Sequence, residues 1–186
     1  MNIEIISGSP RKDSLSHRIV LFLQKYLSEK TEHNVNIIDV RDWAFPLLQQ
    51  EVFSNVERAP EALKPLAKRM FEANAFIMVS PEYNGSYTSA LKNLFDHFPK
   101  QLHKTFAIVT ASPGMLGGLR ASQQMQLLIN ALFGIGSPHM LITPTVDKKF
   151  DEQGNLLDIN FEKSVHNFIT ELLWLAEKIV KEKAVV

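Results

Sequence analysis

The stretch IEIISGSPRKDSLSHRIVLFL, residues 3–23, decides the fold. It opens with a short apolar run of the kind found in a buried strand. From Leu15 onward, apolar side chains recur at helical spacing. The polar residues 8–16 lie between the two patterns and hold one glycine, three serines and one arginine. A strand, a polar loop and a helix in this order are typical of an α/β protein.

Composition limits the classes of protein that fit. The 186 residues suit one domain, so we expect residues 1–186 to form a single unit. Twenty basic and twenty acidic residues give a net charge of zero. The chain therefore lacks the overall positive charge that is typical of nucleic-acid-binding proteins. The same balance weighs slightly against an electron carrier with a strongly acidic surface.

The chain contains no cysteine, which excludes disulfides, thiolate nucleophiles and iron–sulfur ligation. Any redox chemistry must therefore use a cofactor without thiolate ligands. We find neither a secretion signal nor an apolar run long enough for a bilayer, and we expect a cytoplasmic protein without a membrane partner.

Apolar strand-like segments alternate with helical patterns along the whole chain. Strands are predicted over residues 3–7, 35–40, 75–80, 105–111 and 139–143, the last of them stopped by Pro144. Helices are predicted from Leu15, over residues 60–74, 89–98, 121–133 and 161–181, with a polar turn over 150–158. Pro65 either kinks the second helix or marks a later start. This alternation predicts a doubly wound parallel sheet with helices on both faces.

Ligands of such sheets bind at the carboxyl ends of the strands, near the switch in strand order. The loops after the first, third and fourth strands are therefore the candidates. In the first loop, the hydroxyls of Ser9, Ser14 and Ser16, the guanidinium of Arg11 and the helix N-terminus can together bind a phosphate. The loop is neither GxGxxG nor a P-loop. The alternative is that Ser14 or Ser16 only caps the helix.

The other two loops carry turn residues and glycines. Pro81, Asn84 and Gly85 are turn formers, and the side chain of Tyr83 could pack against a flat ring. The third loop holds Gly114, Gly117 and Gly118, which permit close backbone approach to a ligand. Taken singly, either loop could instead be an ordinary strand-to-helix connection.

Together these loops resemble the NADPH-dependent FMN reductase family of flavodoxin-like flavoproteins. The family pattern Gly-Ser-x-Arg-x-x-Ser corresponds to Gly8, Ser9, Arg11 and Ser14. The pattern Pro-Glu-Tyr-Asn-x-Ser, then Leu-Lys-Asn and Asp, corresponds to Pro81, Glu82, Tyr83, Asn84, Ser86, Leu91, Lys92, Asn93 and Asp96. The resemblance implies a five-stranded sheet of order 2-1-3-4-5 and a bound FMN. The implied FMN-binding residues are Ser9, Arg11, Ser14, Ser16, Pro81, Glu82, Tyr83, Asn84, Gly85, Ser112, Gly114 and Gly117.

The resemblance also implies a function. Hydride would pass from NAD(P)H through FMN to a small acceptor such as a quinone, an azo compound, a metal oxyanion or a flavin, with no catalytic side chain. It implies a homodimer or homotetramer as well. Four positions depart from the family pattern. Thr88 and Ser89 stand where Pro and Gly are common, Gly85 stands where a larger residue is common, and Pro10 replaces an aliphatic residue.

Two other functions remain open at this point. A flavodoxin-type carrier would hold FMN but take its electrons from a protein partner. A phosphate-binding module or phosphate-ester hydrolase would use the first loop without flavin. A metal site is not expected, because no two of the six histidines are spaced i,i+4 and none lies in an HExxH pattern. Trp43 and Phe45 could be core, pocket wall or subunit interface.

Overall fold

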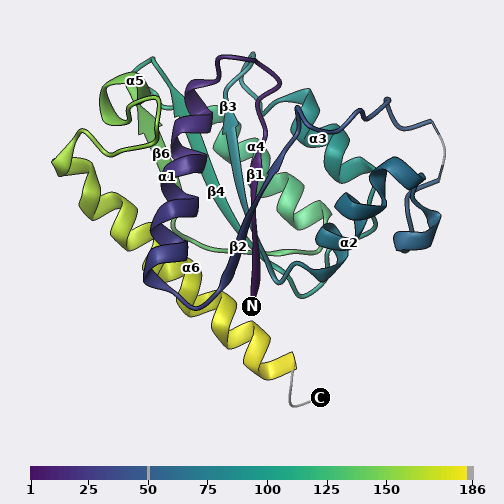
Figure 1. Ribbon diagram of the computed structural model, residues 1–186. Coiled ribbons are helices and arrows are strands. Elements are labelled where there is room, and N and C mark those ends of the chain that lie inside the picture. The colour runs from purple at the N-terminus through teal and green to yellow at the C-terminus, as the bar shows by residue number, and fades with distance from the viewer. Residues whose placement is uncertain (50, 184–186) are drawn as a thin grey trace.

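A parallel sheet forms the centre of the computed structural model, which describes residues 1–49 and 51–183 (Figure 1). Its strands are β1 (Asn2–Ser7), β2 (Asn34–Asp39), β3 (Ala75–Pro81), β4 (Thr105–Ser112), β5 (Ile135–Gly136) and β6 (Leu141–Pro144). They are ordered β2-β1-β3-β4-β5, and β6 also pairs with β4. The predicted order 2-1-3-4-5 is confirmed, with the fifth position divided between two short strands.

Helices cover both faces of this sheet, as the alternating sequence pattern predicted (Figure 1). One face carries α1 (Leu15–Lys30), α5 (Val146–Lys149) and α6 (Glu162–Lys183). The other face carries α2 (Lys64–Glu72), α3 (Ser89–Asp96) and α4 (Leu119–Ala131). Successive strand side chains alternate between these layers: Phe76 packs with α2–α4, whereas Ile77 packs with α1 and α6.

The strand expected over 139–143 is the main difference at the sheet edge. Residues 135–136 pair with the start of β4, and the pairing resumes only at Leu141. Pro138 lies in the interruption and has no N–H to donate to β4. The prediction ended this strand at residue 143, before Pro144. In the structure Pro144 is the last paired residue of β6, opposite Ser112.

The helix expected over 60–74 begins later than Pro60. A 3-10 turn (Glu61–Leu63) comes first, and α2 starts at Lys64 with Pro65 in its first turn. A proline there costs no helical hydrogen bond, because first-turn N–H groups have no partner within the helix. Of the two roles considered for Pro65, marking a later start is therefore confirmed. Two further 3-10 turns, Val56–Arg58 and Ile159–Phe161, and the short α5 were not predicted.

Within residues 1–49 and 51–183, no helix combines the length and apolar character needed to cross a bilayer.

Candidate functional site

The loop after β1 starts with a close approach between two strands. The N–H of Gly8 donates to the Val79 carbonyl at 2.9 Å, and a Cβ on Gly8 would lie only 2.8 Å from that oxygen. Ser9 follows with an exposed fraction of 1%, and its hydroxyl accepts the N–H of Arg11 at 3.3 Å. Glycine is therefore needed for the chain to leave the sheet here and present the loop at its edge.

The two serines at the start of α1 face each other. Ser14 occupies the N-cap position but makes no capping bond with its side chain. Its hydroxyl instead lies 2.9 Å from that of Ser16, the second residue of the helix. The capping interpretation is thus wrong for the Ser14 hydroxyl. Two hydroxyls therefore lie at the positive end of a 16-residue helix, where negative charge is favoured.

The loop after β3 contains a tight turn. Pro81, expected in the turn, is instead the last residue of β3, paired with Ala111. The backbones of Tyr83 and Ser86 exchange hydrogen bonds at 2.8 and 3.1 Å. The two residues between them, Asn84 and Gly85, have φ values of 51° and 81°. Positive φ at both positions is the mark of a type I′ turn, for which Asn-Gly is the preferred pair.

Tyr83 brings the first two loops together. The guanidinium carbon of Arg11 lies 4.8 Å from the centroid of the Tyr83 ring, a cation–π contact. The Tyr83 hydroxyl is buried and has no hydrogen-bond partner within the described part of the chain. Buried hydroxyls are normally paired, so the unpaired oxygen of Tyr83 is unusual in a folded protein.

A second link between these loops comes from Thr88, a position that departs from the family pattern. Its N–H donates to the Ser80 hydroxyl at 3.1 Å, and its own hydroxyl donates to the Gly8 carbonyl. The same oxygen accepts the N–H of Leu91 at 3.1 Å and so caps α3. Thr88 therefore joins the end of β1, the end of β3 and the start of α3.

Glu82 connects the second loop to the third. Its carboxylate accepts the backbone N–H groups of Arg120 and Ala121 at 3.1 and 3.4 Å, and the Arg120 guanidinium lies 3.2 Å away. An acidic side chain at a helix N-terminus is favoured by the helix dipole. The side chain of Glu82 is thus engaged by α4, and its main chain is what remains for a ligand.

Glycines of the third loop serve two different purposes. Gly117 has a φ of 60°, and a Cβ there would lie 2.6 Å from the Pro144 nitrogen, so the fold itself requires glycine. Gly114 is exposed, and a Cβ would meet only the Ser112 hydroxyl, at 3.3 Å. That hydroxyl accepts the Gly114 N–H at 3.0 Å. The space above Gly114 is open to a ligand rather than filled by protein.

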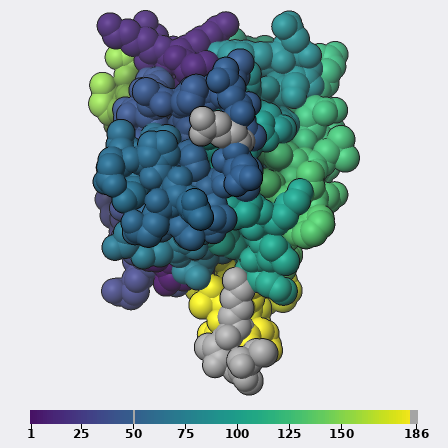
Figure 2. All heavy atoms as spheres, turned by 90° about the vertical axis from the view of Figure 1, so that its right-hand side faces the viewer, coloured from purple at the N-terminus to yellow at the C-terminus, as the bar shows by residue number. Residues whose placement is uncertain are grey.

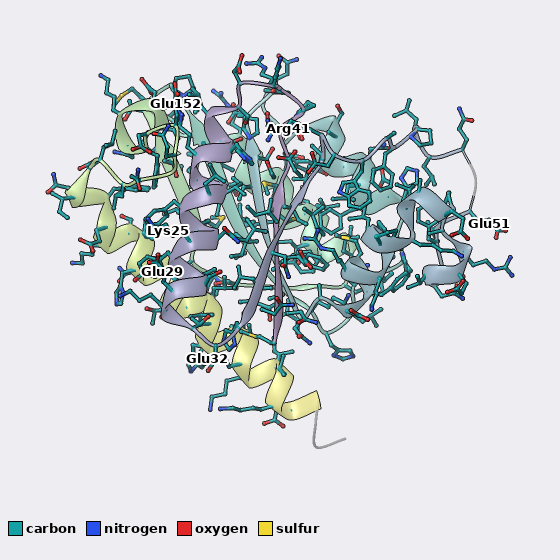
Figure 3. All side chains as sticks on the ribbon, viewed as in Figure 1. Lys25, Glu29, Glu32, Arg41, Glu51 and Glu152 are labelled. Atoms are coloured by element: carbon teal, nitrogen blue, oxygen red, sulfur yellow. The ribbon has the colours of Figure 1, made fainter. Side chains whose placement is uncertain are left out.

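A fourth segment belongs to the same edge, and sequence reasoning missed it. Asp39 ends β2 opposite Ser7, and Arg41 follows two residues later beside the loop that joins β1 to α1 (Figure 3). The available signal was an acidic residue near the end of a predicted strand and an arginine directly after that strand, at the edge where parallel strands end together.

Other candidates take ordinary structural roles. Trp43 and Phe45 are partly buried against the cluster of α2–α4, and the Phe45 ring lies 4.8 Å from that of His97. Across the residues described, no three His, Asp or Glu side chains are grouped as for a metal ion. The guanidinium of Arg120 is paired with the carboxylate of Glu82.

Both a family model and a curated relative match most of this chain. Residues 1–145 match the model of the family described as NADPH-dependent FMN reductase. The chain is 27% identical over 175 residues to an FMN-dependent NADPH-azoreductase from Staphylococcus saprophyticus, covering 91% of this chain and 92% of that protein.

Solved structures agree on the fold. The flavoenzyme NAD(P)H:(acceptor) oxidoreductase FerB from Paracoccus denitrificans aligns with a TM-score of 0.77 at 23% identity, covering 95% of this chain and 97% of that one. A mutant of flavodoxin from Pseudomonas aeruginosa aligns with a TM-score of 0.56 at 16% identity, covering 97% of each chain. The flavodoxin-like architecture expected from the sequence is therefore confirmed.

The family match covers more than half of the chain and includes the three loops that converge at the carboxyl ends of β1, β3 and β4. This chain belongs to the NADPH-dependent FMN reductase family.

Proposed function

We propose that the edge formed by the three loops is the FMN site of an NAD(P)H-dependent oxidoreductase. The observation that carries this proposal is at the start of α1. There the Ser14 hydroxyl bonds the Ser16 hydroxyl instead of capping the helix, close to the cation–π pair of Arg11 and Tyr83. An anion site adjoins a planar aromatic surface there. FMN has the same two parts, a phosphate and a flat ring.

The first loop holds the phosphate in this proposal. Ser14, Ser16 and the backbone of the first turn of α1 donate to it, and the buried Ser9 keeps the loop in shape. Arg11 is exposed and can exchange its contact with the Tyr83 ring for the phosphate oxygens, which suit its forked geometry.

The second and third loops hold the ring. Pro81, Glu82, Tyr83, Asn84 and Gly85 offer backbone groups on one side, and the Tyr83 hydroxyl still lacks a partner among the described residues. Ser112, Gly114 and Gly117 form the other side, where the bare Cα of Gly114 permits close approach.

When bound, FMN supplies the redox chemistry by accepting a hydride from NAD(P)H and passing it to the acceptor. The chain contributes binding, orientation and exclusion of water, and we assign no side chain a catalytic role. We propose a small organic acceptor of the azo or quinone kind, since a relative named above is an azoreductase.

We further propose a cytoplasmic location, because reduced nicotinamide cofactors are generated there, and a single functional domain. Both apolar layers pack on the same sheet, which supports the single domain.

We propose that α4 and its flanks form a homodimer or homotetramer interface. Between Lys104 and Asp147, Arg120 is the only Asp, Glu, Lys or Arg in the sequence. The segment nevertheless exposes large apolar side chains: Met115, Leu116, Leu119, Leu127, Phe133 and Ile135. It forms the green border at the right of Figure 2. Depletion of charge with exposed apolar residues is typical of the centre of a subunit interface. Met115 and Leu116 belong to the third loop, so such an interface would adjoin the site.

A spectroscopic experiment tests the function directly. The purified chain is mixed with FMN, freed of unbound ligand, and treated with NADPH without oxygen. We expect retained flavin absorbance that bleaches with NADPH alone, and reoxidation by an azo dye. Flavin that stays oxidised with both NADPH and NADH would instead indicate a carrier that needs a protein partner. A chain that retains no flavin would contradict the site.

Substitution of Arg11 tests the phosphate assignment. We expect Arg11→Ala to weaken FMN binding by about 1.5–3 kcal/mol, because a hydrogen bond to a charged group is lost. Flavin fluorescence titration measures the change. Arg58→Ala, at an exposed position on the turn before α2, is the control and should bind FMN normally. Equal affinity in both variants would remove Arg11 from the site.

Gly114→Val tests the ring assignment without disturbing the fold. A Cβ at this position would meet only the Ser112 hydroxyl, so we expect the midpoint of thermal unfolding to stay near that of the wild type. FMN affinity and turnover should each fall at least tenfold. Gly117→Ala is the contrasting variant, in which strain at positive φ should lower thermal stability. Full flavin binding by Gly114→Val would exclude the third loop from the site.

Leu127→Glu tests the interface. Leu127 is 62% exposed, and a buried charge at the centre of an interface should shift the chain to monomers in sedimentation experiments. Leu157, at 58% exposure, lies outside the segment between Lys104 and Asp147, and Leu157→Glu should leave the assembly intact. A wild-type monomer at all concentrations, or an unchanged oligomer in Leu127→Glu, would contradict the proposed surface.

A further inference from the structure

The residues at the end of β2 form a polar cluster that the proposed contacts with FMN do not use. Asp39 is buried, with an exposed fraction of 5%, and lies beside Ser7 in the pairing of β1 and β2. Its Oδ1 accepts both the backbone N–H of Arg41, at 2.9 Å, and the Nε–H of Arg41, at 2.8 Å. A second guanidinium nitrogen reaches Oδ2, so the carboxylate holds the planar fork of Arg41 in one orientation.

The free side of the fork faces the first loop. Its remaining nitrogen donates to the carbonyl of Lys12 at 2.9 Å and lies 3.5 Å from the carbonyl of Arg11. These carbonyls belong to the residues immediately before the helix start that carries Ser14 and Ser16. Arg41 therefore ties the outer part of the loop to the rigid end of β2, although Lys12 and Arg41 are 29 residues apart in the chain.

His17 completes the cluster from the first turn of α1. Its Nδ1 lies 3.0 Å from the Ser7 hydroxyl and 3.3 Å from Asp39 Oδ2. Burial, with the nearby Arg41, lowers the pKa of His17 below its ordinary value. Burial raises the pKa of Asp39, but the bonds from Arg41 outweigh it and lower that pKa. At neutral pH the cluster is thus a carboxylate paired with a guanidinium beside a neutral imidazole, and its negative charge is compensated.

We propose that Arg41 is a positioning residue that sets the preference of this chain for FMN over riboflavin. By fixing the carbonyls of Arg11 and Lys12, it holds the start of α1 so that the hydroxyls of Ser14 and Ser16 and the N–H groups of the first helical turn converge on one phosphate. Arg41 does so through the loop and without touching the cofactor. The inference rests on the proposed FMN site.

The chain provides a matched control in the middle of the same two strands. Like Arg41, Arg69 donates to a buried carboxylate: its Nε lies 3.1 Å from Glu4 Oε1. It also donates to the backbone carbonyl of Ile37 at 2.7 Å. Glu4 and Ile37 lie within β1 and β2, and neither belongs to a loop of the proposed site. Loss of Arg69 therefore removes a similar set of bonds without affecting the phosphate loop.

The experiment measures dissociation constants for FMN and for riboflavin, which lacks the phosphate, on the wild type, Arg41→Ala, Arg41→Lys and Arg69→Ala. We expect Arg41→Ala to weaken FMN binding roughly tenfold and to leave the affinity for riboflavin nearly unchanged. The reason is that the first loop contacts only the phosphate in the proposed site. Arg41→Lys keeps the charge but lacks the fork, so it should lose most of the same preference. Arg69→Ala should lower thermal stability and keep the FMN-to-riboflavin ratio of the wild type.

A ratio unchanged in both Arg41 variants would overturn the inference and leave the proposed FMN site intact. If Arg41→Lys kept the wild-type ratio of FMN to riboflavin affinity while Arg41→Ala lost it, the inference would also be overturned, because positive charge rather than positioning would then suffice. Equal loss of FMN and riboflavin in the Arg41 variants, matched by Arg69→Ala, would reduce Arg41 to a structural residue. A wild type that binds no FMN would instead overturn the proposed function, and the inference with it.

Discussion

The contact between Gly8 and Val79 is the constraint on which the site depends. The backbone of β1 leaves the sheet so close to β3 that no side chain fits between them, and the Gly8 N–H is fixed to the Val79 carbonyl at 2.9 Å. The first loop therefore rises directly beside the second. In a doubly wound sheet, these two strands lead to helices on opposite faces, and the crevice opens where their connections diverge. Here α1 follows β1 on one face, and α3 follows β3 on the other.

Hydrogen bonds across this crevice separate the groups that hold the loops from those left for a ligand. Thr88 fixes the second loop to the first, Glu82 fixes it to α4, and Arg41 fixes the first loop to β2. Each of these polar side chains is occupied by the protein itself. The two serine hydroxyls at the start of α1 bond each other, and the Tyr83 hydroxyl has no partner in the described chain. A site assembled before the ligand arrives loses less conformational freedom on binding.

Sequence revealed the local features of this arrangement and missed the long-range ones. Buried parallel strands read as continuous apolar runs, and four of the five were located to within one or two residues. The serine-rich loop and the Asn84–Gly85 turn are visible as composition, whereas the two residues of β5 leave no periodic pattern. The proposed role of Arg41 depends on the register that places Asp39 of β2 opposite Ser7 at the end of β1. The Glu82 carboxylate accepts hydrogen bonds from a helix that starts 37 residues later. Such contacts follow from the packing of the sheet, and no local pattern encodes them.

Thr88 shows how a departure from a family pattern can preserve geometry by other means. Proline, common at this position in the family, restricts the backbone covalently but has no N–H and no hydroxyl. Threonine restricts it less, yet here its N–H, its hydroxyl hydrogen and its hydroxyl oxygen each make a separate hydrogen bond. All three bonds are buried, where partners cannot be exchanged for water without cost. The second loop is thus held by a polar network instead of a rigid ring, and the same three bonds also join it to the first loop and to α3. Any change at Thr88 would therefore act on both the phosphate side and the ring side of the proposed site.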